Sequence, residues 1–448
     1  MTQPRFQLAP DVWPVVELGV GDIRGGTQQA KWDVSKWDTA GSLWAGSEPT
    51  WLDITCDVIS VASHVGRERS ISRFDPGTCT IVAANSTGWA DILQTPANPA
   101  LLSIRPGRQI RWGVQRGTSP PVWKWRGFID AHAANYDGQT ADTDTVTLTC
   151  IDALGEVGRV ALSKVDPPVG AGEAANVRIT RILDAAGWRT EWRDIQPSSV
   201  AMLATDLDGR AVDQLSQVAD TVGGSVFGDI QNRVAFRNRD WQTWLPSRPY
   251  DATIGNVAPT DVCPNVFDLR FDRSETTTRA VVNYEGAAGG PVVVDDTNAQ
   301  LLYGVETSPE MTDLQSSDTA QLTTIANRII RTQGIGTQPR VQAVTFDAAR
   351  GDPTVTAMIG ADPFVPTLWR VRIVRDGRTL ADRVMFVTSV DHELDAKTWT
   401  LRVGLDDAAP WQAQGGRWDG AYWDRALWAS VAQLRDEAVR LLDRLEVA

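Results

Sequence analysis

The chain has 448 residues and a formal net charge of −13, with 43 Lys and Arg residues against 56 Asp and Glu residues. This length predicts about three domains of ordinary size, each able to bury its own core. The acidic balance argues against a protein that grips nucleic acid through its phosphates, and no long apolar run predicts a membrane span. The first twenty residues lack the basic start and apolar core of a secretory signal, so synthesis in a cytoplasm is expected.

Residues 1–165 are predicted to form a β-barrel-like domain. The runs LDITCDVISV, TCTIVAAN and DTVTLTCID are rich in β-branched residues, and the last alternates Val146, Leu148 and Cys150 with polar neighbours. Two further strands are expected in SIRPGRQIRWGV and VWKWRGFIDA, on either side of a Pro-rich loop. Many short strands between Gly and Pro turns are typical of a sandwich or a barrel.

A small α+β domain is predicted at residues 170–250, because the spacing of apolar residues changes there from every second residue, as in a strand, to about every 3.6 residues, as in a helix. One helix is expected in NVRITRILDAAGW, ended by Gly187, and a second in DGRAVDQLSQVADTVGG, ended by Gly223 and Gly224. The apolar stripes are Ile179, Ile182, Leu183 and Ala186 in the first helix, and Val212, Leu215, Val218, Ala219 and Val222 in the second. A hairpin turning at Gln231-Asn232 is expected to follow.

Residues 255–408 predict a second β-barrel-like domain with one helix at 318–333, for which Asp318 is the expected N-cap. The segment WRVRIVRDGRTLADRVMFVTSV is the strongest hairpin signal in the chain, with its turn at Asp376-Gly377. The expected fold class is therefore mainly β with α+β. Two β-barrel-like domains flank a small mixed α/β domain, and a C-terminal coiled-coil helix follows.

Two segments, residues 31–44 and 417–428, repeat the order Trp-Asp, three residues, Trp-Asp and a third Trp. The five-residue spacing fits neither a helix nor a strand. A turn-rich loop is expected, in which the aspartates bond backbone amides and the indoles hold the loop on a neighbouring surface as a staple. The alternative is an exposed aromatic platform for sugars or a partner chain. The residues are Trp32, Asp33, Trp37, Asp38 and Trp44 in the first copy, and Trp418, Asp419, Trp423, Asp424 and Trp428 in the second.

Residues 411–448 combine the second Trp-Asp segment with a predicted helix that carries a heptad seam. The seam residues are Leu427, Val431, Leu434, Ala438, Leu441 and Leu445. A short parallel bundle of two, three or four chains is favoured, and an ordinary amphipathic helix packed on its own domain is the alternative. Such a short helix is marginal by itself in water, so another part of the protein must bring the chains together.

A search for catalytic or metal sites finds little. His64, His132 and His392 are far apart, and HELDA at His392 lacks the second histidine of a helical zinc site. The segment DLDG, at Asp206 to Gly209, lacks the later ligands of a calcium loop and predicts a turn. We therefore expect no cofactor, no metal and no catalytic residue.

Two other residue sets leave alternatives open. Asp142 and Asp144, or Asp295 and Asp296, are paired carboxylates of the kind that a glycosidase uses. That mechanism requires a defined distance between the two carboxyl groups, which the sequence does not give. The alternative is that these aspartates lie in solvated turns. The four cysteines are widely spaced, and buried free thiols are expected, with a disulfide between neighbouring strands as the alternative. They are Cys56, Cys79, Cys150 and Cys263.

The order of these segments resembles the baseplate hub or tail-tip proteins of tailed bacteriophages, and it is most similar to the minor tail proteins of phages of actinobacteria. The similarity covers most of the chain and lies in the succession of GTCTIVAANSTG, WRGFID, DTVTLTCIDALGEVGRVAL, RITRILDAAGW, AVDQLSQVADTVGGSVFGDIQNRVAFRN and VMFVTSVDHELDAKTWTLRVGL. It implies a structural virion protein that is not an enzyme. In such a hub, two related β-barrel domains per chain form a trimeric, pseudo-sixfold ring that closes the tail tube.

The resemblance also implies partners and a location. The expected partners are two further copies of the chain and the distal tail, tube, tape-measure and other tip proteins, with DNA passing through the ring without specific binding. The expected location is the virion tail tip, assembled in the host bacterial cytoplasm. One alternative function is a Trp-rich receptor- or carbohydrate-binding tail protein that binds host cell-wall glycan. A cell-wall hydrolase is a further alternative, and it requires a catalytic cluster.

Overall fold

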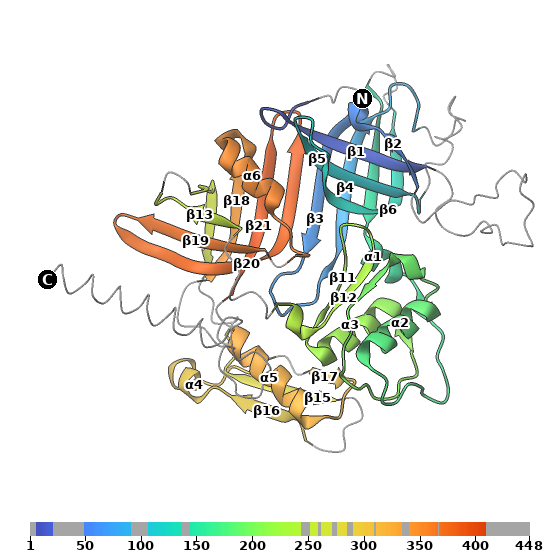
Figure 1. Cartoon of the computed structure of the whole chain (residues 1–448), viewed down its shortest axis with the longest axis vertical. Helices are drawn as coiled ribbons and strands as arrows, with labels where there is room; N and C mark the ends of the chain where they lie inside the picture. Colours follow the sequence, from blue (N-terminus) through green and yellow to red (C-terminus); the bar gives the residue numbers. More distant parts are fainter. Residues whose placement is uncertain are drawn as a thin grey trace, which may run out of the picture.

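The structure is a computed structural model that describes residues 6–20, 49–90, 106–136, 143–242, 251–258, 261–270, 276–284, 290–308, 311–333, 340–365 and 367–408. These residues form a mainly β structure with helices, as the sequence predicts. Figure 1 shows a large curved sheet with two smaller α/β units packed below it.

The first β unit contains seven strands. They are β1 (Val12–Val20), β2 (Thr50–Asp53), β3 (Val58–Gly66), β4 (Asp75–Ala84), β5 (Gln109–Arg116), β6 (Val122–Asn135) and β7 (Thr145–Ile151). Their order in the sheet is β2-β1-β5-β6-β7-β4-β3. The predicted alternation in β7 is confirmed, because Val146, Leu148 and Cys150 are buried. Figure 1 shows β1 and β5 running across β3 and β4, so the sheet folds over its own core.

The second β unit is built on the hairpin of β19 (Leu368–Arg375) and β20 (Arg378–Asp395). Asp376 and Gly377 form its two-residue turn with φ of 52° and 73°, the positive values that a type I′ turn requires, and the predicted hairpin is confirmed. The other elements of this unit are β13 (Ala252–Gly255), β14 (Val266–Arg270), β18 (Arg340–Asp347), α6 (Asp352–Gly360) and β21 (Trp399–Asp407).

The two β units are one continuous sheet. Strand β20 pairs antiparallel with β3, from Ser389 opposite Gly66 to Asp395 opposite Ser60, and this pairing joins all 13 strands. The main path of the sheet ends at β14 and at β2, which do not pair with each other in the part of the chain that the structure describes. The two barrel-like shapes expected from the sequence are therefore not confirmed, and no closed barrel is found among the described strands.

The mixed unit contains the two helices and the hairpin that the sequence predicts. Its elements are α1 (Ala153–Val157), β8 (Ala161–Leu162), α2 (Ala175–Ala185), β9 (Arg193–Ile195), β10 (Gly209–Arg210), α3 (Ala211–Val222), β11 (Ser225–Gly228) and β12 (Val234–Arg237). Its core also includes residues before 170, from α1 and β8. The two predicted helices are α2 and α3, and Gly223 ends α3 in the left-handed conformation with φ of 71°. The predicted hairpin is β11–β12, with Asn232 at φ of 62° in its turn.

A second small unit packs its own core. It contains β15 (Arg279–Tyr284), β16 (Val292–Asp295), α4 (Thr297–Tyr303), β17 (Met311–Leu314) and α5 (Thr319–Gln333), with the strands in the order β16-β15-β17. The predicted helix at 318–333 is α5, and the side chain of Asp318 accepts a hydrogen bond from the amide of Ala320 at 2.9 Å. The helix packs on β15 and β16, and its core is separate from that of the large sheet.

Candidate functional site

The site residues predicted from the sequence lie outside the described residues, in segments 21–48 and 409–448. This holds for the staples Trp32, Asp33, Trp37, Asp38, Trp44, Trp418, Asp419, Trp423, Asp424 and Trp428. It also holds for the seam residues Leu427, Val431, Leu434, Ala438, Leu441 and Leu445. Both sets therefore stay predictions, and the geometry below comes from other residues.

A tryptophan clamp holds one arginine on the outward face of the first β unit. The guanidinium carbon of Arg111 lies 3.9 Å from the ring centroids of both Trp51 and Trp123. Glu17 holds the same guanidinium through contacts of 2.6 and 2.8 Å. Strands β2, β5, β6 and β1 supply these four side chains. Because Arg111 lies against one face of each indole, that face of Trp51 and of Trp123 is not an open surface for a ligand.

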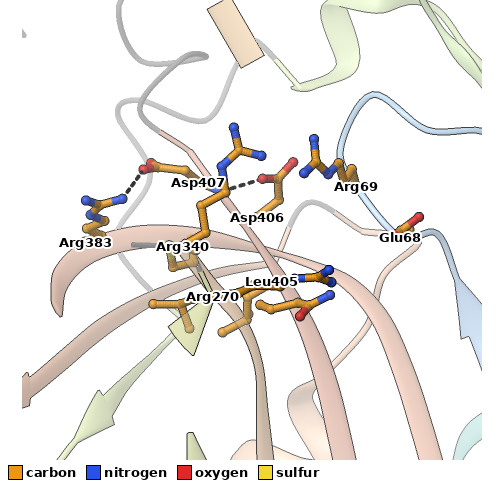
Figure 2. Close-up of a pocket in the computed structure, with 11 residues that line it drawn as sticks. Glu68, Arg69, Arg270, Arg340, Arg383, Leu405, Asp406 and Asp407 are labelled. Carbon is orange, nitrogen blue, oxygen red and sulfur yellow. Dashed lines mark hydrogen bonds and ion pairs between the residues drawn. The ribbon is translucent and has the colours of Figure 1, made fainter. Parts of the chain in front are cut away.

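A shallow charged cleft, open to solvent on one side, lies where several strands of the second β unit end. Figure 2 shows the carboxylate of Asp406 between the guanidinium groups of Arg340 and Arg69. The lining residues are Glu68, Arg69, Arg270, Arg340, Val341, Gln342, Arg383, Met385, Leu405, Asp406 and Asp407. They come from the loop after β3 and from β14, β18, β20 and β21. Four arginines and three acidic residues thus form a surface of mixed sign.

Asp406 and Asp407 of this cleft have defined hydrogen-bond partners. One carboxylate oxygen of Asp406 accepts hydrogen bonds from the amide and the hydroxyl of Ser70, at 2.8 and 2.5 Å. Asp407 pairs with Arg383 at 3.2 Å. The contacts of Ser70 tie the loop after β3, in the first β unit, to the end of β21 in the second, and the Arg383–Asp407 pair joins β20 to β21 within the second unit.

A buried polar contact joins the two β units elsewhere. Lys124 of β6 donates hydrogen bonds to the carbonyl oxygens of Ile359 and Ala361, at the C-terminal end of α6. A cation is favourable there because a helix C-terminus carries partial negative charge. Burial lowers the pKa of Lys124 to about 8, and Asp362 acts in the opposite direction. The first β unit thereby holds the helix of the second.

His392 is fully buried beside this contact. Its Nδ1 lies 3.3 Å from the indole nitrogen of Trp399, which donates to it, and its ring packs nearly perpendicular to that of Trp112, with centroids 4.9 Å apart. Its Nε2 is buried without a hydrogen-bond partner among the described residues. Burial, and then Lys124, lowers the pKa of His392 well below its ordinary value, so the ring is neutral at pH 7.

The other candidates for chemistry lie apart from each other. His64 forms an ion pair with Asp391, and this hydrogen bond is the main cause that raises the pKa of His64. Asp206 is part of a turn and lies 3.2 Å from Lys164. Within the ranges that the structure describes, no three His, Cys, Asp or Glu side chains are grouped to hold a metal ion. No helix of those ranges is both long and apolar enough to cross a membrane.

The four cysteines are free thiols in the structure. The expectation of buried thiols is confirmed for Cys79 on β4 and Cys150 on β7. It is wrong for Cys263, which is exposed, and Cys56 is partly buried in the short 3-10 helix Thr55–Asp57.

No protein-family model and no curated protein sequence matches the chain. Two solved structures are similar to it over most of its length. A tail protein from Neisseria meningitidis MC58 aligns with a TM-score of 0.54 and 12% identity, over 89% of this chain and 98% of the other. The 43 kDa tail protein of prophage MuSo2 from Shewanella oneidensis aligns with a TM-score of 0.54 and 10% identity, over 89% and 99%.

The chain shares its fold with these two tail proteins. The resemblance to phage tail proteins that the order of segments implied is thus confirmed at the level of the fold. The similarity reaches across both β units and the units between them, because it covers 89% of the chain.

Sequence reasoning missed the tryptophan clamp, the charged cleft and the buried contact of Lys124. The cleft could not be predicted, because its residues come from five segments that only the sheet brings together. A weak signal existed for the clamp. Trp51 and Trp123 both sit at outward positions of strands, where a large indole needs a partner to be covered.

Proposed function

We propose that the protein is a structural component of a phage virion, forming a ring of three copies in the tail tip or baseplate hub. The observation that carries this proposal is the shared fold, which spans 89% of the chain and nearly the whole of two tail proteins, one of them from a prophage. The ring closes the tail tube and anchors the tip proteins that serve host attachment and DNA ejection.

The arrangement of the large sheet supports a ring. Each chain places two β units side by side in one sheet, so three chains supply six units around an axis. Among the described strands, β2 pairs only with β1 and β14 only with β18, and edge strands present unpaired backbone groups to a neighbour. On β14, Val266 and Leu269 are 51% and 37% exposed, which suits burial against another copy.

The partners follow from this place in the virion. The tube and distal tail proteins lie above the ring, the tape-measure protein reaches it, and DNA passes through its lumen. The net charge of −13 suits a lumen that repels DNA rather than binding it. The heptad residues Leu427 to Leu445 form a short threefold seam, and the Trp-Asp segments hold the ends of the chain in place.

The test is to locate the protein in purified virions. An antibody raised against the chain is expected to label one end of the tail in electron micrographs, opposite the head. Label along the whole tube or on the head, or absence of the chain from virions that contain the other tail proteins, would refute the proposal. Zymography on host cell wall and glycan arrays in the same preparation test the hydrolase and receptor-binding alternatives.

A further inference from the structure

We infer that the tip of the β19–β20 hairpin docks on an acidic surface of a second copy of this chain. The basic tip consists of Arg372, Arg375, Arg378 and Leu380, whose side chains are all exposed. Figure 1 shows the hairpin reaching out from the large sheet past β13. The inference rests on the proposed function, because it names a surface through which the copies of the ring meet.

Two arginines stand directly opposite each other at this tip. The strand register pairs Arg375 with Arg378 across the turn at Asp376 and Gly377. Like charges directly opposite each other on antiparallel strands destabilise the pair. Asp376 lies 3.9 Å from Arg375, but the two side chains are 91% and 80% exposed, so this ion pair contributes little. A partner that carries negative charge would remove the repulsion between the two arginines.

The strand edge beside the tip limits how a partner can bind. Strand β13 pairs with β19 only from Trp369 to Arg372. Beyond that point, the side chain of Asn256 accepts a hydrogen bond from the amide of Val374 at 2.9 Å and donates one to its carbonyl at 2.7 Å. Because these backbone groups are already bonded, a partner meets this part of the hairpin through side chains rather than by adding a strand.

Charge selects the kind of partner. Residues 368–383 contain five arginines and two aspartates, a net charge of +3, whereas the whole chain carries −13. The other residues together therefore carry −16, so a second copy offers negative charge to the basic tip. Complementary charges of this kind guide association and fix the orientation of the two partners.

A protein fits the tip better than a nucleic acid does. Asp376 and Asp382 lie among the arginines of the hairpin, where they would repel the phosphates of a nucleic acid. Leu380 is 42% exposed beside the arginines and adds apolar area that a protein surface can bury. Arginine is also enriched in protein interfaces.

Arg375→Glu separates folding from association. It places an acidic side chain opposite Arg378, so the urea midpoint of unfolding should not fall at a concentration where the chain is monomeric. Light scattering at low salt should show that the variant needs about tenfold more protein than the wild type to form trimers. Added salt should weaken association of the wild type more than that of the variant. Arg210→Glu reverses the charge of another exposed arginine, and this matched control should associate like the wild type.

Crosslinking identifies the surface that the tip contacts. A photo-crosslinking amino acid in place of Leu380, in a mixture of isotopically labelled and unlabelled chains, is expected to join two different copies. The crosslinked peptide of the second copy should contain exposed Asp or Glu residues. Crosslinks confined to a single copy would overturn the inference.

The other outcomes separate this inference from the ring. Trimers that form equally well with Arg375→Glu and Arg210→Glu would overturn the docking of the tip and leave the ring in place. A wild-type chain that stays monomeric at every concentration would contradict the ring, and the inference would fail with it. A gel shift of double-stranded DNA by the wild type that Arg375→Glu abolishes would assign the tip to nucleic acid instead.

Discussion

Replacing Arg178 by methionine is expected to destabilise the protein by roughly 3–5 kcal/mol, the usual cost of breaking a buried ion pair from one side. Arg178 of α2 is completely buried and pairs with Glu173. It also donates to the carbonyl oxygens of Leu203 at 2.6 Å and Gly170 at 3.0 Å, and to the side-chain oxygen of Gln315 at 3.0 Å. Through Gln315 it connects the mixed unit to the segment between β17 and α5.

The structure sets the size of the effect. Methionine keeps much of the apolar stem, so little packing is lost. Three oxygen acceptors lose a donor in a buried site, and each such loss costs about 1–3 kcal/mol when no water replaces it. Glu173 keeps a second partner, because Arg181 lies 2.6 Å from its other carboxylate oxygen. The carboxylate is therefore not left alone, and the expected value lies toward the lower end of the range.

Arg181→Met is the matched control, because it removes an arginine from the same carboxylate on the exposed side. The side chain of Arg181 is 42% exposed, and such a pair contributes about 0–1 kcal/mol. Urea unfolding followed by circular dichroism measures both variants, with the slope against urea checked for constancy. Equal losses in the two variants, or a loss below about 1 kcal/mol for Arg178→Met, would refute the assignment of the buried network.

Four further changes test other parts of the account. The pKa of His392 is well below its ordinary value of 6.5 in the folded protein, so as the pH falls the histidine binds a proton in the unfolded chain before it does so in the folded one. The free energy of unfolding should therefore fall as the pH drops below about 6.5. His392→Gln should weaken this fall, as measured by urea unfolding at a series of pH values. Asp152 is buried at the N-cap of α1, where its carboxylate accepts a hydrogen bond from the amide of Gly155 at 2.9 Å. Burial raises its pKa from 3.8 to about 6, so the stability it contributes is present below about pH 4 and is lost as the pH rises through about 6. Asp152→Asn should flatten the pH profile of the free energy of unfolding in this range. Gly377→Ala should cost about 1–2 kcal/mol in thermal unfolding, because Gly377 has φ of 73°. Truncation after Gln414 should leave a folded chain that associates less, and an unchanged mass in solution would count against the C-terminal seam.

The sequence correctly predicted the turns and helix ends that depend on one or two neighbouring residues. Asp376-Gly377 gave the β19–β20 hairpin because few residue pairs accept two positive φ angles, and Gly223 ended α3 for the same reason. Asp318 predicted the start of α5 because a carboxylate can accept a hydrogen bond from a free backbone amide.

Contacts between residues far apart in the chain could not be predicted from the sequence. The joint between β3 and β20 connects residues more than 300 positions apart, and both strands show only ordinary alternation. The strand pair β15–β17 is parallel, and a sequence does not show which strands come together across a long connection.

In the candidate sites, too, local features could be predicted from the sequence and long-range contacts could not. The apolar stripe of α2 was visible, but the burial of Arg178 beside that stripe was not, because an arginine in a helix usually faces solvent. The opposition of Arg375 and Arg378 follows from the two-residue turn between them, but the place where β13 stops pairing with β19 does not show in the sequence. The tryptophans of residues 31–44 and 417–428, which the sequence predicts to act as staples, lie outside the described residues.

The central claim is that three copies of this chain form a ring, and the mass of the purified protein in solution tests it most directly. Light scattering over a range of concentrations is expected to give a trimer, or a monomer that becomes a trimer as the concentration rises. A strict monomer at every concentration, or a stable dimer, would contradict the ring.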